Sequence, residues 1–128
     1  MALPHAGNGA FSQFAAETVS CGKWKRRNQQ CGRCVPCLIR RASLHAAGVP
    51  DGTDYQYPDL QAVMTDEGGR DDLVAVQAAL IRGGDAERHV MSAGPLPTTA
   101  TDRRAYVDVA ERGMVELRQY LASEGFAV

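Results

Sequence analysis

All four cysteines of this 128-residue chain lie within seventeen residues of one another. Cys21, Cys31, Cys34 and Cys37 follow the pattern C-x9-C-x2-C-x2-C. A C-x2-C pair lets two thiolates converge from one tight turn, and zinc takes four such ligands in a tetrahedron. The spacing therefore predicts one structural zinc ion, because four thiolates leave no open position for a water molecule. An iron–sulfur cluster, which also takes cysteine ligands, is the alternative metal group.

Two disulfides, or four unrelated buried thiols, are the competing interpretations of these cysteines. The N-terminus lacks the basic start and apolar stretch of a secretory signal, so we expect a cytoplasmic protein with reduced thiols. Nearby basic residues, such as Lys23 and Arg33, favour the thiolate form that binds metal. Gly32 supplies the backbone freedom that the turn between Cys31 and Cys34 needs.

A basic loop with one aromatic residue, Lys23-Trp24-Lys25-Arg26-Arg27, follows the first cysteine. Cations beside an aromatic ring suit phosphate contact and base stacking, so a nucleic acid or a nucleotide is a candidate partner. The candidate contacts to an anion or a partner are Lys23, Lys25, Arg26, Arg27 and Arg40. The alternative is a solvated loop whose tryptophan packs on the cysteine cluster.

The formal net charge of −1 hides an asymmetry between the two parts of the chain. Residues 1–50 carry a net charge of +6, and residues 51–128 carry −7. Either the basic part meets an anionic partner, or the two parts attract each other within the molecule.

Length and composition are those of one ordinary folded domain. Hydrophobic residues make up 45% of the chain and charged residues 23%, which excludes wholesale disorder. No run of 18 apolar residues occurs, which argues against a transmembrane helix. Apolar periodicity, proline and glycine predict helices over 10–17, 36–47, 58–64, 71–82 and 102–124. Residues 1–9 are expected to be irregular, and so are the rest of 48–69 and all of 83–101.

Three of these helices have apolar stripes that should face a core. The predicted buried residues are Leu38, Ile39, Ala42 and Ala46, then Leu73, Val76, Leu80 and Ile81, then Tyr106, Val109, Ala110, Met114, Leu117 and Leu121. We therefore predict a mostly α fold, with a small four-cysteine zinc knuckle followed by three or four helices. Residues 1–17 form an N-terminal segment, 18–57 the zinc-binding segment and 58–128 a helical C-terminal region.

Other polar residues offer no catalytic constellation. The histidines His5, His45 and His89 stand apart from any partner motif, and His45 is expected to be a half-buried helix residue. The acidic pair Asp71-Asp72 suits a solvated helix start. We therefore predict no catalytic residue in this chain.

Residues 18–55 resemble one known family. The carrying motifs are Thr18-Val19-Ser20-Cys21, Cys31-Gly32-Arg33-Cys34-Val35-Pro36-Cys37-Leu38-Ile39-Arg40-Arg41 and Gly48-Val49-Pro50-Asp51-Gly52-Thr53-Asp54-Tyr55. They look like the C-terminal zinc segment of 7-cyano-7-deazaguanine synthases, the QueC-like proteins of the queuosine pathway. The phrase around Cys37 further resembles the QueC-like component of Qat antiphage systems. The resemblance implies ATP-dependent conversion of a deazaguanine carboxylate to a nitrile in the full family.

The chain departs from that family in one important respect. The family binds ATP through a Ser-Gly-Gly-x-Asp-Ser loop on a Rossmann-like domain, and this sequence contains no such loop. The diglycines Gly68-Gly69 and Gly83-Gly84 lack the leading serine and are interpreted as turns. We therefore expect a C-terminal fragment or truncated relative that is inactive alone and depends on a partner chain with the ATP-binding domain. The alternative is a self-standing zinc-knuckle module that binds nucleic acid or protein, for example in antiphage defence.

Overall fold

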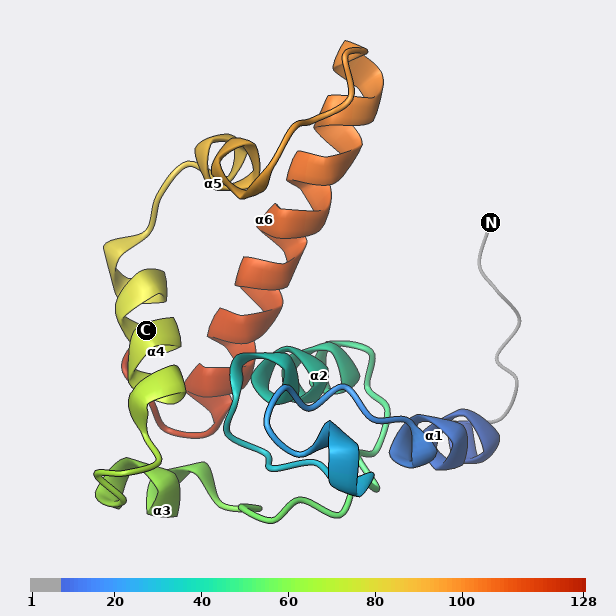
Figure 1. Ribbon diagram of the computed structural model, residues 1–128, viewed down its shortest axis with the longest axis vertical. Helices are drawn as coiled ribbons and strands as arrows, with labels where there is room; N and C mark the ends of the chain where they lie inside the picture. Colours follow the sequence, from blue (N-terminus) through green and yellow to red (C-terminus); the bar gives the residue numbers. More distant parts are fainter. Residues whose placement is uncertain (1–7) are drawn as a thin grey trace.

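The computed structural model describes residues 8–128, which fold into a series of helices joined by loops (Figure 1). The α-helices are α1 (Asn8–Glu17), α2 (Val35–Ala46), α3 (Leu60–Thr65), α4 (Asp71–Arg82), α5 (Ala86–Ala93) and α6 (Ala100–Ser123), and a 3₁₀ helix, η1, covers Lys25–Arg27. Within the described residues no strand forms, and the single extended pairing is a bridge between Gln30 and Tyr55. The prediction of a mostly α fold is confirmed.

The start of the chain is only partly covered by the structure. Residues 1–7 of the predicted irregular start, with His5, lie outside the described residues. Asn8 and Gly9 already belong to α1, so the predicted boundary at residue 10 was two residues late. Among the described helices, none is both long enough and apolar enough to cross a membrane.

The main core lies where α2 crosses the C-terminal half of α6, with α3 and α4 closing its sides (Figure 1). Its buried side chains are Leu38, Ala42, Leu60, Val63, Leu73, Leu80, Tyr120, Leu121 and Phe126. The C-terminal tail returns along α4, where Gln77 Nε2 donates to the carbonyl oxygen of Ala127 at 2.9 Å. This core holds α2 in place, and α2 in turn carries the last cysteine.

Local signals set several helix ends as expected. Cys34 is the N-cap of α2, and Pro36 lies in its first turn, where the missing N–H costs nothing. Gly48, at φ +64°, follows the end of α2. Helix α4 covers the predicted range 71–82, and Gly125, at φ +88°, follows α6.

The segment 83–101 was predicted to be a loop, and this was wrong. Helix α5 forms within it because Asp85 Oδ1 accepts from the backbone N–H of Glu87 at 2.9 Å and so caps the helix. Ala86 is buried, and α5 packs against the N-terminal half of α6. A helix of two turns carries too little periodicity to be found in sequence, and packing against a neighbour stabilises it.

Several predicted core positions are exposed. Ile39, Ile81, Tyr106 and Val109 expose 47%, 63%, 56% and 61% of their surface. The reason is visible for α6, whose N-terminal half extends well past α2 with only α5 beside it (Figure 1). Within residues 8–128, no other segment therefore covers the apolar side chains of Tyr106 and Val109. The positions buried instead are Arg41, Leu44, Val107 and Tyr120.

Candidate metal centre

The four cysteine sulfurs converge on one point in the interior. Their Sγ atoms all lie within 4.8 Å of one another, and no cysteine exposes more than 2% of its surface. The Sγ atoms of Cys21 and Cys34 are 3.8 Å apart, and those of Cys31 and Cys37 are 3.9 Å apart. A tetrahedron with zinc–sulfur bonds of about 2.3 Å has edges of about 3.8 Å. The cluster could therefore hold a metal ion, and its spacing is consistent with zinc.

The same distances bear on the disulfide interpretation. All four cysteines are free thiols, and the sulfur separations are far longer than the roughly 2.05 Å of a disulfide bond. The structure thus brings together the four residues predicted as ligands. That they hold zinc in solution stays a prediction.

Backbone N–H groups point at the sulfurs from two turns. Cys21 Sγ accepts from the N–H of Trp24 at 3.2 Å and from that of Cys31 at 3.4 Å. Cys31 Sγ accepts from the N–H of Cys34 at 3.4 Å. Cys34 and Cys37 lie at the start of α2, where the helix dipole favours negative charge. Such donors stabilise thiolates, which are the form that a metal needs.

The thiols differ in how easily they lose a proton. Burial raises the pKa of Cys21, but N–H groups of Cys31, Trp24 and Lys23 outweigh it and lower that pKa to about 7. Burial raises the pKa of Cys31 and of Cys37, more than nearby backbone N–H groups lower it. Because a metal binds thiolates, burial of Cys31 and Cys37 opposes metal binding, and the backbone N–H groups near their sulfurs favour it.

A tight glycine turn closes the site. Gly32 has φ +87°, and a Cβ there would lie 2.6 Å from Arg41 Nη2 and 2.6 Å from the carbonyl oxygen of Tyr57. The Tyr57 N–H in turn donates to the carbonyl oxygen of Cys31 at 3.0 Å. The turn that carries two cysteines is thus clamped between α2 and the segment after it. The expectation that this turn needs a glycine agrees with both the backbone angle and the available space.

Two residues around the site were missed from sequence. Gln30 is 3% exposed; its Nε2 donates to the carbonyl oxygen of Thr18 at 2.9 Å, and its Oε1 lies 3.4 Å from Cys37 Sγ. Arg41 is 7% exposed. A glutamine in a polar loop and the second of two arginines on a helix give no signal that they are buried. Only the path of the surrounding chain decides it.

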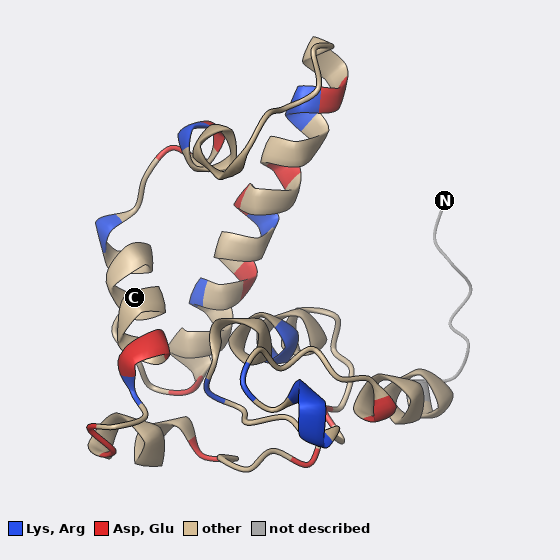
Figure 2. Ribbon diagram, in the orientation of Figure 1, with Lys and Arg blue, Asp and Glu red and all other residues tan. Residues whose placement is uncertain are grey.

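Among the candidate anion contacts, basic residues form η1 and one more, Arg40, lies on α2 (Figure 2). Some of their side chains are free and others are engaged by neighbouring residues. Lys25 and Arg26 are exposed on η1. Lys23 pairs with Asp72 at 3.3 Å, and the guanidinium of Arg27 lies 4.8 Å from the centre of the Trp24 ring.

Arg40 has structural partners. It donates to Thr53 Oγ1 at 3.1 Å, to Thr18 Oγ1 at 2.9 Å and to the carbonyl oxygen of Ala15. It therefore ties α1 and the segment after α2 to α2 itself. An anion would have to compete with these contacts.

Trp24 packs on the cysteine cluster together with Val19 and Tyr55. This matches the alternative interpretation of the basic loop.

Arg33 pairs with Asp66 at 3.2 Å. The Lys23–Asp72 pair likewise joins the basic and the acidic part of the chain. These two ion pairs support the interpretation that the two parts attract each other within the molecule.

The remaining candidates lie away from the cysteines. His45 is exposed, rather than half-buried as expected, and its ring centre lies 5.6 Å from that of Tyr120. His89 is exposed in α5 rather than in a loop. Asp71 and Asp72 occupy the first turn of α4, as expected for a solvated helix start.

Part of the chain is similar to known enzymes. It is 50% identical over 50 residues to a 7-cyano-7-deazaguanine synthase of Rhizobium meliloti, which covers 39% of this chain and 20% of that protein. It is 55% identical over 42 residues to the 7-cyano-7-deazaguanine synthase of Cupriavidus metallidurans, covering 33% of this chain and 18% of that protein. The matched part spans about a fifth of the length of these relatives.

The other comparisons give no match. No family model matches the chain, and no solved structure matches it. The resemblance inferred from the cysteine motifs is confirmed at the level of this partial similarity, and the four-cysteine cluster fits a zinc-binding segment.

Proposed function

We propose that residues 18–57 form a structural zinc-binding unit of a protein related to 7-cyano-7-deazaguanine synthases. The observation that carries the proposal is the convergence of four buried cysteine sulfurs within 4.8 Å in a chain that is half identical to those enzymes over 50 residues. In this role the unit stabilises the protein and supports ATP-dependent nitrile formation on a deazaguanine carboxylate. Residues outside this chain carry out the reaction.

The donor set favours zinc in a closed structural site. Cys21, Cys31, Cys34 and Cys37 would hold the ion, and four thiolates complete its tetrahedron. A bound zinc ion would supply folding free energy at this site. The backbone N–H groups of Trp24, Cys31 and Cys34 would share the negative charge of the thiolates.

The absence of a phosphate-binding loop from this sequence supports dependence on a partner chain. Gly68-Gly69 precedes α4 and Gly83-Gly84 precedes α5, but within residues 8–128 neither follows a strand, as phosphate-binding loops do. We therefore propose that a partner chain supplies the ATP-binding domain.

Elemental analysis of protein purified without chelator tests the metal. We expect about one zinc per chain, as structural sites bind zinc with free energies on the order of 10 kcal/mol. Replacing Cys37→Ser should abolish stoichiometric zinc binding. The control Ser43→Ala changes an exposed residue of the same helix that is not a ligand, so this variant should retain zinc. A folded protein with four titratable thiols and no metal would contradict the proposal, and bound iron with sulfide would replace zinc by an iron–sulfur cluster.

Calorimetry with ATP and magnesium tests the proposal that a partner chain supplies the ATP-binding domain. The chain alone should show no tight, magnesium-dependent binding, because no run of glycine N–H groups is available to cradle a phosphate. Tight binding would reveal a nucleotide site in this chain and contradict the need for a partner.

A second candidate function is nucleic-acid binding, for example in antiphage defence. The exposed side chains of Lys25 and Arg26 beside the Arg27–Trp24 pair favour it. Oligonucleotide binding should then weaken steeply with salt, and the double change Lys25→Ala and Arg26→Ala should lower the slope by about two. The matched control is Arg112→Ala on the exposed side of α6. Salt-independent or undetectable binding would exclude this function.

A further inference from the structure

A cavity of about 390 Å³ lies between the ends of two helices, and one residue of its lining, Tyr55, also packs on the cysteine cluster. Its lining includes Arg41 and His45 from α2, Asp51 and Tyr55 from the segment after α2, and Tyr120 and Glu124 from the end of α6. The cavity therefore exists only because α6 returns to pack on α2. Its lining carries side chains of both charges.

The positive element is Arg41, a buried cation without a counter-ion. It is 7% exposed, and within residues 8–128 it pairs with no carboxylate. Its guanidinium donates to the carbonyl oxygens of Tyr57 at 2.7 Å and Pro58 at 3.0 Å, and to Tyr120 Oη at 3.3 Å. Its Nε has no acceptor. A buried cation that meets only neutral acceptors and an aromatic ring has no counter-ion, so this position favours an anionic group of a ligand.

The negative elements lie around the same cavity. Glu124 makes no ion pair in the described chain, and its side chain accepts no hydrogen bond there. Asp51 accepts from Tyr55 Oη at 2.7 Å and keeps lone pairs for a further donor. Helices α2 and α6 both end here, at Ala46 and Ser123, and helix C-termini carry partial negative charge. This surrounding favours a cationic group.

The buried cation and the carboxylates around it together favour one class of ligand. A simple anion would meet the carboxylates of Asp51 and Glu124, and a simple cation would meet Arg41. A molecule that carries both charges satisfies both. Tyr55, under the Arg41 guanidinium, and the neighbouring rings of Tyr120 and His45 give the lining an aromatic part that suits an apolar body between the charges.

We propose that this cavity binds a small zwitterion with a carboxylate and a protonated amine, of the size of an amino acid with an apolar side chain. The carboxylate faces Arg41 and the hydroxyl of Tyr120, and the ammonium group faces Glu124 and Asp51. This binding goes beyond the proposed function and involves none of its ATP-dependent chemistry.

Three matched probes test the charge requirement on the full chain. We would follow backbone NMR shifts during titration with L-phenylalanine, with N-acetyl-L-phenylalanine, which lacks the ammonium, and with 2-phenylethylamine, which lacks the carboxylate. L-phenylalanine should saturate at roughly millimolar concentration and shift the amides of Arg41, His45 and Tyr120. The other two should bind at least about tenfold more weakly. Equal binding of all three probes, or no saturable shift with L-phenylalanine, would overturn the proposal.

One variant then separates charge recognition from loss of fold. Glu124→Gln removes a carboxylate that holds no other side chain in place, so the fold should persist. L-phenylalanine should bind several-fold more weakly to it, and N-acetyl-L-phenylalanine should bind more tightly than to the parent. The control Glu67→Gln changes an exposed carboxylate away from the cavity and should alter neither affinity. Identical affinities for Glu124→Gln and the parent would refute the assignment of the ammonium position.

Discussion

At the scale of single residues, Gly32 and Arg41 link the cysteine turn to the core. Arg41 lies against Gly32 on one side, and the centre of the Tyr55 ring is 3.9 Å from its guanidinium carbon. The same guanidinium reaches Tyr120 on α6. A guanidinium with several planar donors can bridge three chain segments in this way, where a lysine could not.

Replacing Gly32→Val should release the metal and destabilise the protein. A valine would bear the strain of a positive φ, roughly 1–3 kcal/mol, and its Cβ would also clash with Arg41 and with the carbonyl oxygen of Tyr57. Zinc retention during a chelator titration and the thermal midpoint would measure both effects.

Gly48→Val is the matched control for this change. Gly48 also has a positive φ, +64°, but a Cβ there would meet nothing within 4 Å. The control should therefore show the backbone strain alone and keep its zinc. If the two variants lose zinc equally, the close contact at Gly32 has no role in metal retention.

At the scale of elements, α6 contains a glycine that its surroundings do not need. Gly113 lies within the helix, and a Cβ there would meet nothing within 4 Å. The helix carries the entropic cost of a glycine without a packing gain.

Replacing Gly113→Ala should stabilise the protein by about 0.5–1 kcal/mol, the helix propensity difference between the two residues. Denaturant unfolding would measure the change in free energy. The reverse change at an exposed position of the same helix, Ala105→Gly, should lower stability by a similar amount. A destabilised Gly113→Ala variant would show that this face of α6 meets a partner in solution.

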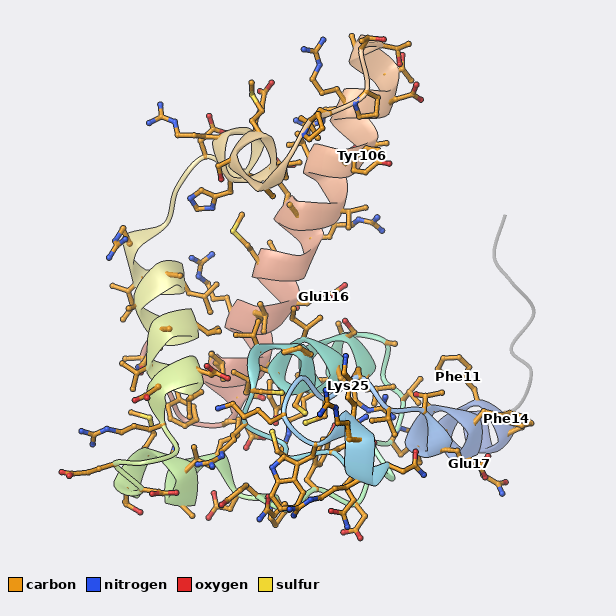
Figure 3. All side chains as sticks on the ribbon, in the orientation of Figure 1. Phe11, Phe14, Glu17, Lys25, Tyr106 and Glu116 are labelled. Carbon is orange, nitrogen blue, oxygen red and sulfur yellow. The ribbon has the colours of Figure 1, made fainter. Side chains whose placement is uncertain are left out.

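Helix α1 shows how an element can be held by polar contacts while its aromatic side chains face outward. Ser12 Oγ donates to the carbonyl oxygen of Pro50 at 2.6 Å, and Arg40 reaches Ala15. Phe11 and Phe14 expose 57% and 69% of their surface and project away from the rest of the molecule (Figure 3). The position of α1 is therefore set by its contacts to α2 and to the segment after α2.

At the scale of the whole molecule, the cysteine cluster and the helical core form one connected structure. The Tyr57–Cys31 hydrogen bond and the Arg41–Tyr120 contact run from the metal ligands to the end of α6. Among the described helices, α5 is the one that packs on the N-terminal half of α6, which lies away from this path. Metal binding should thus affect the two halves of α6 differently.

Removing the metal should selectively weaken the C-terminal half of α6. We expect faster amide hydrogen exchange over residues 35–46 and 117–126 after chelation, because the cysteine turn no longer holds Arg41 and Tyr57 in place. Exchange over residues 100–107 should change little. Uniform loss of protection along α6 would instead indicate one cooperative unfolding unit, and unchanged protection at 117–126 would contradict the connection.

The sequence by itself determined the features whose signals are local. The cysteine spacing brought Cys31, Cys34 and Cys37 together because they lie on one short turn and the start of α2, and Cys21 reaches them across the basic loop. The range of α4 was correct because glycines, acidic residues and a regular apolar pattern mark both its ends and its body. Gly32 could be predicted as a tight turn for the same reason. The identity of the metal and the division of the chain at residues 18–57 stay predictions.

Only the tertiary structure decided which faces are buried and which residues meet across the chain. Ile39 and Tyr106 fit their helical stripes but are exposed, and Arg41 is buried although it is charged. Helix α5 forms where the sequence suggested a loop, because α6 offers it a surface. The cavity by Glu124 combines side chains that are more than 80 positions apart in sequence, such as Arg41 and Glu124. Burial depends on which other segment packs on a face, and a local pattern of residues does not contain that information.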